Sequence, residues 1–255
     1  MANTVYENKI IEAKAKDLLT TAINTRSLMT VDTSLAESAG MTKTINVYTY
    51  TGEAEALGAG EGNSVRGAIS FVGNDYKVQR VQANFDYTDE DFMKDNTVVD
   101  NGVAGATAIL KNKMNGDFFG ECAKATLKVT GALSYDTIVD AISELNVEDE
   151  SKIFVVIPNS EKKALRKDPD YIAARQGEVV YNGQVGTVAG IPVVASKAAT
   201  EAYVMTPDAV KLFMKKDVEA EQDRDKDKCT NSVYIRSVYV CALVDATKIC
   251  KIANA

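Results

Sequence analysis

The chain has 255 residues, 45% of them hydrophobic and 25% charged, so it can bury a large core and is neither disordered nor fibrous. Its net charge of −7 opposes tight binding to nucleic-acid phosphates, and the absence of histidine removes the Ser-His-Asp triad and the common zinc sites. We therefore expect a protein that is not an enzyme, binds no metal or cofactor and, lacking a long apolar run, has no membrane partner. Its four cysteines form no C-x-x-C pair, so we expect free thiols in a reducing compartment.

The N-terminal segments predict a helix, an extended arm and a long hairpin. Residues 6–25 carry apolar side chains at helical spacing, and residues 26–43 are mixed and polar. Residues 44–51 are rich in β-branched and aromatic side chains and predict a strand. Extended character resumes at 68–72 and 76–87. Because an isolated two-stranded hairpin is marginal in water, we expect this one to lie on a neighbouring subunit.

The tip of that hairpin is acidic and rich in glycine. The stretch Gly58-Ala59-Gly60-Glu61-Gly62 invites comparison with a dinucleotide-binding loop, which lies between a strand and a helix. The residues after it are extended in character, so the sequence favours a flexible tip.

The next segment predicts one long helix. It opens with the capping sequence Thr88-Asp89-Glu90-Asp91, and its apolar side chains keep one face aligned for about 35 to 40 residues, or about 50 to 60 Å. A compact chain of this size has a radius of gyration of only about 18 Å, so we expect a flat, elongated subunit. The pair Asn101-Gly102 is the expected place for a kink.

The C-terminal half predicts a mixed α/β region followed by strands. Ser134 caps a helix, and Thr206 with Pro207 is expected to open another that runs to Met214. The remaining expectations are a strand at 153–157, a short helix at 159–167, a polar loop at 168–184, strands within 185–194 and at 202–205, and strands at 217–223, 230–244 and 247–252.

The acidic run Asp223-Arg224-Asp225-Lys226-Asp227 offers a rival from another class, a hydrolase based on carboxylates. Its spacing also opens a calcium-binding loop, but Lys228 stands at the turn glycine and Tyr234 at the bidentate glutamate. We interpret the run as a solvated turn.

The order of arm, glycine-rich hairpin, long helix, α/β region and returning strands resembles the Hong Kong 97-type fold of tailed-phage major capsid proteins and encapsulins. The local matches are Val81–Phe92, where a strand leads into the capped helix, and Val188–Val194, which resembles a G-x-P-V-V strand. The resemblance implies an α+β fold and this division: an N-terminal helix and arm (1–43), an E-loop (44–80), a peripheral domain with the spine helix (81–130), an axial domain (131–210) and return strands of the peripheral domain (211–255).

The resemblance also implies a function. Copies of the chain would form the pentamers and hexamers of an icosahedral shell, assembled in the bacterial host cytoplasm, that encloses double-stranded DNA without sequence-specific binding. Further partners would be portal, scaffold or decoration proteins. The alternative is an encapsulin-type compartment with an enzyme cargo.

Three sets of interface residues follow from the resemblance. We hypothesise that acids of the E-loop tip dock near lysines on the spine helix of a neighbour. Since residues 51–67 contain no lysine, we do not expect the covalent E-loop crosslink of some family members. The expected residues are Glu53, Glu55, Glu61 and Arg66 at the tip, Lys111, Lys113 and Lys124 on the spine, and Asp168, Arg175, Glu178 and Asn182 in the loop at the capsomer axis.

Overall fold

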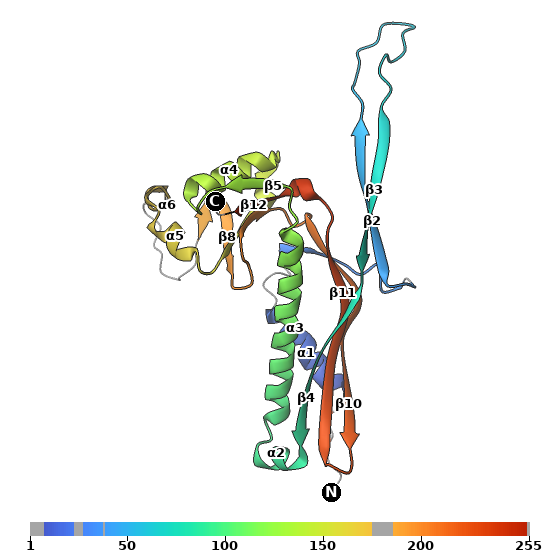
Figure 1. The fold of residues 1–255 in the computed structure, drawn as a ribbon, viewed down its shortest axis with the longest axis vertical. Coiled ribbons are helices and arrows are strands. Elements are labelled where there is room, and N and C mark those ends of the chain that lie inside the picture. The colour runs from blue at the N-terminus through green and yellow to red at the C-terminus, as the bar shows by residue number, and fades with distance from the viewer. Residues whose placement is uncertain (1–7, 23–27, 38, 175–185, 254–255) are drawn as a thin grey trace.

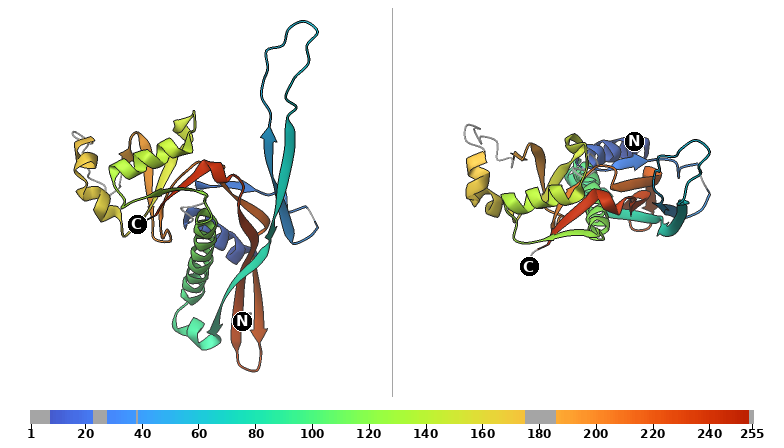
Figure 2. Two further views of the ribbon diagram at one scale, coloured as in Figure 1. Left: turned by 45° about the horizontal axis from the view of Figure 1, so that its top comes forward. Right: turned by 90° about the horizontal axis from the view of Figure 1, so that it is seen from above.

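The computed structural model describes residues 8–22, 28–37, 39–174 and 186–253. Within these ranges the chain forms a four-stranded sheet beside a long helix, a six-stranded α/β unit, and a two-stranded hairpin (Figure 1). The hairpin and the α/β unit extend from different sides of the body formed by the helix and the four-stranded sheet (Figures 1 and 2). The expected α+β class and elongated outline are confirmed.

The four-stranded sheet has the order β1-β10-β11-β4. Two long strands form its centre and pair in antiparallel fashion from Val210↔Leu243 to Asp225↔Thr230. The short β1 runs parallel to β10, and β4 pairs antiparallel with β11. The bounds are β1 Thr30–Asp32, β4 Gln79–Thr88, β10 Val210–Asp225 and β11 Thr230–Leu243.

The helix expected from Thr206 to Met214 is wrong. The N–H of Ala209 donates to the carbonyl of Thr206 at 3.1 Å, which closes a turn, and β10 begins at Val210. Leu212 and Met214 are buried in the core and pair with residues of β11. Tertiary pairing with a long neighbouring strand therefore overrides a genuine helix-start signal.

The long helix is divided into α2 (Asp89–Lys94) and α3 (Val98–Cys122). Thr88 and Asp91 form the expected capping box, with the N–H of Asp91 donating to Oγ1 of Thr88 at 3.1 Å. The break lies not at Asn101-Gly102 but before Thr97, whose N–H and hydroxyl donate to Oδ1 of Asp95 at 2.8 and 2.7 Å. This local bonding competes with helical hydrogen bonds, and the 25 residues of α3 span about 37 Å, less than expected.

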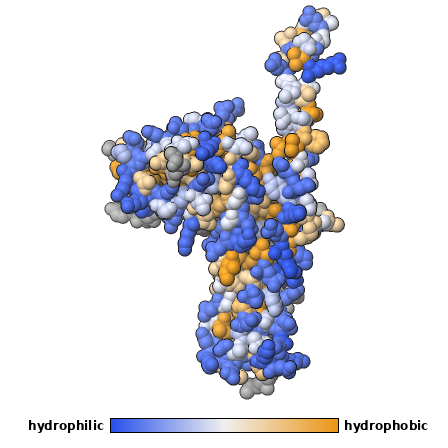
Figure 3. Space-filling view, in the orientation of Figure 1, coloured by the Kyte–Doolittle hydropathy of each residue, from blue (hydrophilic) through white to orange (hydrophobic). Residues whose placement is uncertain are grey.

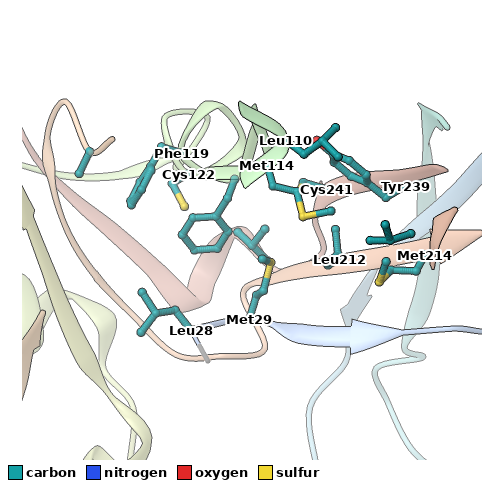
Figure 4. Packing of buried hydrophobic residues seen from close by; sticks show 14 of the residues in the cluster. Leu28, Met29, Leu110, Met114, Phe119, Cys122, Leu212, Met214, Tyr239 and Cys241 are labelled. Carbon is teal, nitrogen blue, oxygen red and sulfur yellow. The ribbon is translucent and has the colours of Figure 1, made fainter. Parts of the chain in front are cut away.

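The main core lies between α3, the four-stranded sheet and the N-terminal helix α1 (Asn8–Ala22). The ion pair between Lys14 and Asp100, at 2.5 Å, links α1 to α3, and Ile11 and Ala15 of α1 are buried in the same cluster. Side chains of α3 and the four-stranded sheet meet those of Leu28 and Met29, which precede β1, in Figure 4. The labelled residues are Leu28, Met29, Leu110, Met114, Phe119, Cys122, Leu212, Met214, Tyr239 and Cys241.

The six-stranded sheet of the α/β unit has the order β5-β12-β9-β6-β8-β7. Its strands are β5 Leu127–Thr130, β6 Phe154–Pro158, β7 Thr187–Val188, β8 Ile191–Ser196, β9 Ala202–Met205 and β12 Ile249–Ala253. Its helices are α4 Tyr135–Leu145, α5 Lys162–Lys167 and α6 Pro169–Ala174. Short 3-10 turns occur at Glu150–Lys152 and Ala246–Lys248.

The α/β unit differs from expectation at its expected loop and in the extent of its sheet. The loop expected at 168–184 begins instead with helix α6, in which Pro169 is the first residue and Asp170 an acid of the first turn, both favourable at a helix start. Strands β5 and β12, from outside the expected range 131–210, pair with each other and complete the sheet.

Candidate assembly surfaces

The hairpin of β2 (Thr42–Thr51) and β3 (Ala68–Lys77) extends beyond the rest of the protomer, as Figures 1 and 2 show. Its strands pair with each other from Thr42↔Lys77 to Thr51↔Ala68. At its base the Tyr76 hydroxyl donates to the carbonyl of Leu243 at 3.0 Å, and Nζ of Lys124 lies 5.7 Å from the Tyr76 ring centroid. The base is therefore anchored to the body, and the shaft is not.

One face of this shaft is apolar and exposed. The register places Tyr48 opposite Phe71 and Tyr50 opposite Ile69, so these four side chains share a face, and each is between 62% and 70% exposed. The rings of Tyr48 and Phe71 lie 5.7 Å apart, centroid to centroid. Figure 3 shows hydrophobic surface along this shaft. An exposed apolar patch on a two-stranded hairpin is typical of a surface that another molecule covers.

Two of the three expected acids at the hairpin tip accept hydrogen bonds from the backbone of the same loop. Glu55 accepts from the N–H and hydroxyl of Ser64, at 2.7 and 2.6 Å, and from the N–H of Val65 at 2.9 Å. The Ser64 hydroxyl, with these N–H groups, lowers the pKa of Glu55. Glu61 accepts from the N–H of Gly58 at 3.1 Å. Glu53 and Arg66, the other expected tip residues, make no ion pair among the residues that the structure describes.

The expected spine lysines differ in their local partners. Lys113 pairs with Asp117, and Lys124 pairs with Glu121, each at 2.6 Å. Lys111 has no ion pair within the described part of the chain. A tip carboxylate from another copy would therefore share Lys113 or Lys124 with an existing partner. The protomer itself does not bring tip and spine residues together.

Asp168, expected at the capsomer axis, connects two helices of the α/β unit. Its carboxylate accepts from the N–H of Tyr135 at 2.6 Å, at the start of α4, and from the N–H of Asp170 at 3.0 Å. This is a structural role within the protomer. The other expected residues of this loop, Arg175, Glu178 and Asn182, lie outside the described residues.

A cleft of about 410 Å³ at the base of the hairpin was not predicted. Its wall includes Asp117, which accepts from the Tyr239 hydroxyl at 2.9 Å. It also includes Glu121, whose buried Oε2 has no hydrogen-bond partner among the residues that the structure describes. Burial, with the nearby Asp117 carboxylate, raises the pKa of Tyr239. No motif could reveal this cleft, because β3, α3 and β11 each contribute part of its lining.

The acidic run at 223–227 forms the end of β10 and the turn into β11. Oδ1 of Asp225 accepts from the N–H groups of Asp227 and Lys228, and Arg224 pairs with Asp89 at 2.6 Å. The interpretation as a solvated turn is confirmed. Over the described ranges, no group of three or more His, Cys, Asp and Glu side chains is placed to hold a metal ion.

Comparisons with known proteins agree with this architecture. The sequence model of a family described as phage capsid protein matches residues 72–252. The major capsid protein of Staphylococcus phage phiMR11 is 26% identical over 241 residues, which cover 89% of this chain and 86% of that protein. None of the described helices is long and apolar enough to span a membrane.

Solved structures show the same fold at low sequence identity. The capsid of cyanophage P-SCSP1u matches with a TM-score of 0.70 and 12% identity, covering 89% of this chain and 86% of that one. A virus-like particle from Pyrococcus furiosus matches with a TM-score of 0.65 and 10% identity, covering 97% and 100%. The chain has the Hong Kong 97-type capsid fold of these structures. Because the family model matches most of the sequence, the chain belongs to the phage capsid protein family.

Proposed function

We propose that this chain is the major capsid protein of a tailed phage or of a prophage-derived particle. Its role is structural: copies form pentamers and hexamers, and these close into an icosahedral shell around double-stranded DNA. The observation that carries the proposal beyond the family match is the exposed apolar face of the β2–β3 hairpin, which has no cover within the described protomer.

The parts of the subunit map onto roles in such a shell. The β2–β3 hairpin serves as the E-loop, α3 with the four-stranded sheet as the peripheral domain, and the α/β unit as the axial domain around the capsomer axis. The pairing of β5 with β12 supports including both strands in the axial domain, beyond the limits 131–210.

The contacts between copies are heterologous, because the hairpin of one subunit lies on a different surface of the next. Each contact can be weak, since many act together in a closed shell. The net charge of −7 suits a container that encloses DNA without binding it tightly. Portal, scaffold or decoration proteins are further proposed partners, and the bacterial host cytoplasm is the proposed place of assembly.

Substitution of the apolar face tests the role of the hairpin. Tyr48, Tyr50, Ile69 and Phe71 are changed together to threonine, which retains strand propensity, and particles are counted by electron microscopy and sedimentation. We expect a folded subunit that no longer forms closed shells. A matched control changes Thr49 and Ser70, which pair on the opposite face, to alanine and keeps assembly. Normal shells from the fourfold variant would refute this use of the hairpin.

The alternative is an encapsulin-type compartment, because a virus-like particle is among the structures with the same fold. The contents of particles purified from the native source separate the two functions. A genome-length double-stranded DNA supports the phage capsid, whereas a single enzyme in place of DNA supports the compartment.

A further inference from the structure

All the charged residues of helix α4 in the α/β unit are acidic, and they lie on its exposed face. Asp136, Asp140 and Glu144 follow at intervals of four residues and are all exposed, while Ile138, Ala141, Ile142 and Leu145 of the opposite face are buried. Like charges at this spacing repel one another on a helix. The helix contains no lysine or arginine that could offset them.

Helix α5 of the same unit has the opposite character. Its sequence is Lys-Lys-Ala-Leu-Arg-Lys, with Leu165 fully buried and Lys163 and Lys167 exposed on the other side. Lys162 and Lys163 stand in the first turn, where the helix dipole disfavours cations. The helix dipole favours Asp136 in the first turn of α4 and Lys167 in the last turn of α5. It does not explain Asp140 and Glu144, or the two lysines in the first turn of α5.

These two charged surfaces do not neutralise each other within one protomer. Across the described residues, Asp136, Asp140 and Glu144 form no ion pair, and neither do Lys162, Lys163 and Lys167. In Figure 1, α4 lies along the upper edge of the α/β unit and α5 at its lower left. A single subunit thus presents complementary charges in two separate places.

We infer that the acidic face of α4 in one copy docks against the basic face of α5 in the next copy around the capsomer axis. The occupant is a second copy of this chain because the complementary surface is on the chain itself. In a ring each copy offers α4 to one neighbour and α5 to the other, which makes the contact head-to-tail and places opposite charges together at each boundary. The inference rests on the proposed shell function and adds the residues that set subunit order in a capsomer.

Charge reversal tests the contact. Variant A carries Asp136→Lys, Asp140→Lys and Glu144→Lys, and variant B carries Lys162→Glu, Lys163→Glu and Lys167→Glu. In variant A both surfaces are basic, and in variant B both are acidic, so each repels itself in a ring. In a hexamer, by contrast, an alternating ring of A and B restores opposite charges at every contact, whereas a pentamer keeps at least one contact between like charges. A third variant carries all six changes and restores the pair with its polarity exchanged.

Each protein is purified alone, its fold is checked by circular dichroism, and assembly is measured by sedimentation and electron microscopy. We expect A and B each to lose about tenfold or more of their particle yield, because a defect at one contact repeats throughout the shell. We expect the sixfold variant to recover closed particles, and the equimolar mixture to recover hexamers that contain both chains.

The outcomes separate the two levels of the proposal. If A or B alone assembles as well as the wild type, or if neither the mixture nor the sixfold variant recovers, the α4–α5 contact is refuted while the shell function stands. If the wild-type chain forms no closed particle with or without coexpressed phage proteins, the proposed function fails, and the contact fails with it.

Discussion

The ring of Phe85 on β4 occupies the space that a side chain at position 102 of α3 would need. A Cβ atom built on Gly102 would lie 2.3 Å from Cε2 of Phe85, far inside a van der Waals contact. This explains a glycine in the interior of the long helix, where it lowers helix propensity. The close approach lets α3 pack directly on the four-stranded sheet.

Substitution of Gly102 by alanine should therefore destabilise the subunit. Overpacking costs about 1 to 3 kcal/mol, and the gain in helix propensity returns about 1 kcal/mol, so we expect a net loss of up to about 2 kcal/mol. Gly105→Ala is the matched control, because no atom of the described residues lies within 4 Å of its Cβ position. It should leave stability unchanged or raise it by up to about 1 kcal/mol. Urea unfolding of unassembled subunits measures both, and equal effects at the two sites would contradict the packing explanation.

Asp168 should contribute to folding even in the absence of assembly. Asp168→Ala removes the carboxylate that accepts from Tyr135 N–H at 2.6 Å, so we expect the free energy of unfolding to fall by about 1.5 to 3 kcal/mol. Asp170→Ala, two residues away, is the control, because the Asp170 side chain is exposed and makes no hydrogen bond with described residues. Its effect should stay within about 0.5 kcal/mol. A stable Asp168→Ala subunit that fails only in assembly would instead place this carboxylate at an interface.

The four cysteines should differ sharply in reactivity. Cys229 is exposed in the turn between β10 and β11, whereas Cys122, Cys241 and Cys250 are buried. Burial raises the pKa of Cys241 to about 12 and that of Cys250 to about 11, and it raises that of Cys122 as well. Since the thiolate is the reactive form, iodoacetamide should label only Cys229 in the native subunit at neutral pH, and all four after denaturation.

Mass spectrometry of labelled peptides checks this order. Cys229→Ser is the control and should abolish native labelling. Rapid native labelling at Cys241 would show that the core between α3 and β11 opens readily, contrary to its burial.

The sequence predicted elements well where periodicity and capping agree. The β2–β3 hairpin, the Thr88 capping box and the Ser134 start of α4 are each signalled by side chains within a few residues of one another. The helix expected at 206–214 failed because the cap-like Thr206 and Pro207 are local, whereas the partner of β10 lies about thirty residues further along the chain.

The assembly surfaces were less predictable than the fold. The sequence shows which residues are acidic and basic, but it does not predict their local partners. In the structure Glu55 accepts from Ser64, and Lys113 pairs with Asp117. Such pairings depend on side-chain geometry in a folded loop or helix. The apolar face of the hairpin was, in principle, accessible from the alternation of Tyr48 and Tyr50, although its register with β3 was needed to complete it.

Glu219 should make the stability of the subunit depend on pH in the acid range. It lies beside the irregular part of β10, where the register with β11 shifts between Met214 and Lys216 and again between Lys216 and Glu219. Its carboxylate pairs with Nζ of Lys216 at 2.9 Å and Nε of Arg236 at 3.0 Å. These hydrogen bonds, that from Lys216 first, lower its pKa below the usual 4.5.

Because the pKa of Glu219 is lower in the folded chain than in the unfolded chain, its contribution to stability is present above pH 4.5 and is lost as the pH falls through the folded-state value. Glu219→Gln should therefore lower Tm at neutral pH, and the difference from the wild type should shrink in acid as the wild-type carboxylate is protonated. Thermal unfolding of both proteins across this pH range measures the difference in Tm. The other carboxylates are the same in both proteins, so their contributions cancel in this difference. Glu90→Gln, at an exposed residue without an ion pair in the described chain, is the control for the loss of one charge. A Tm difference at Glu219 that stays constant into acid would mean that packing at the irregular segment, and not the charge, stabilises it.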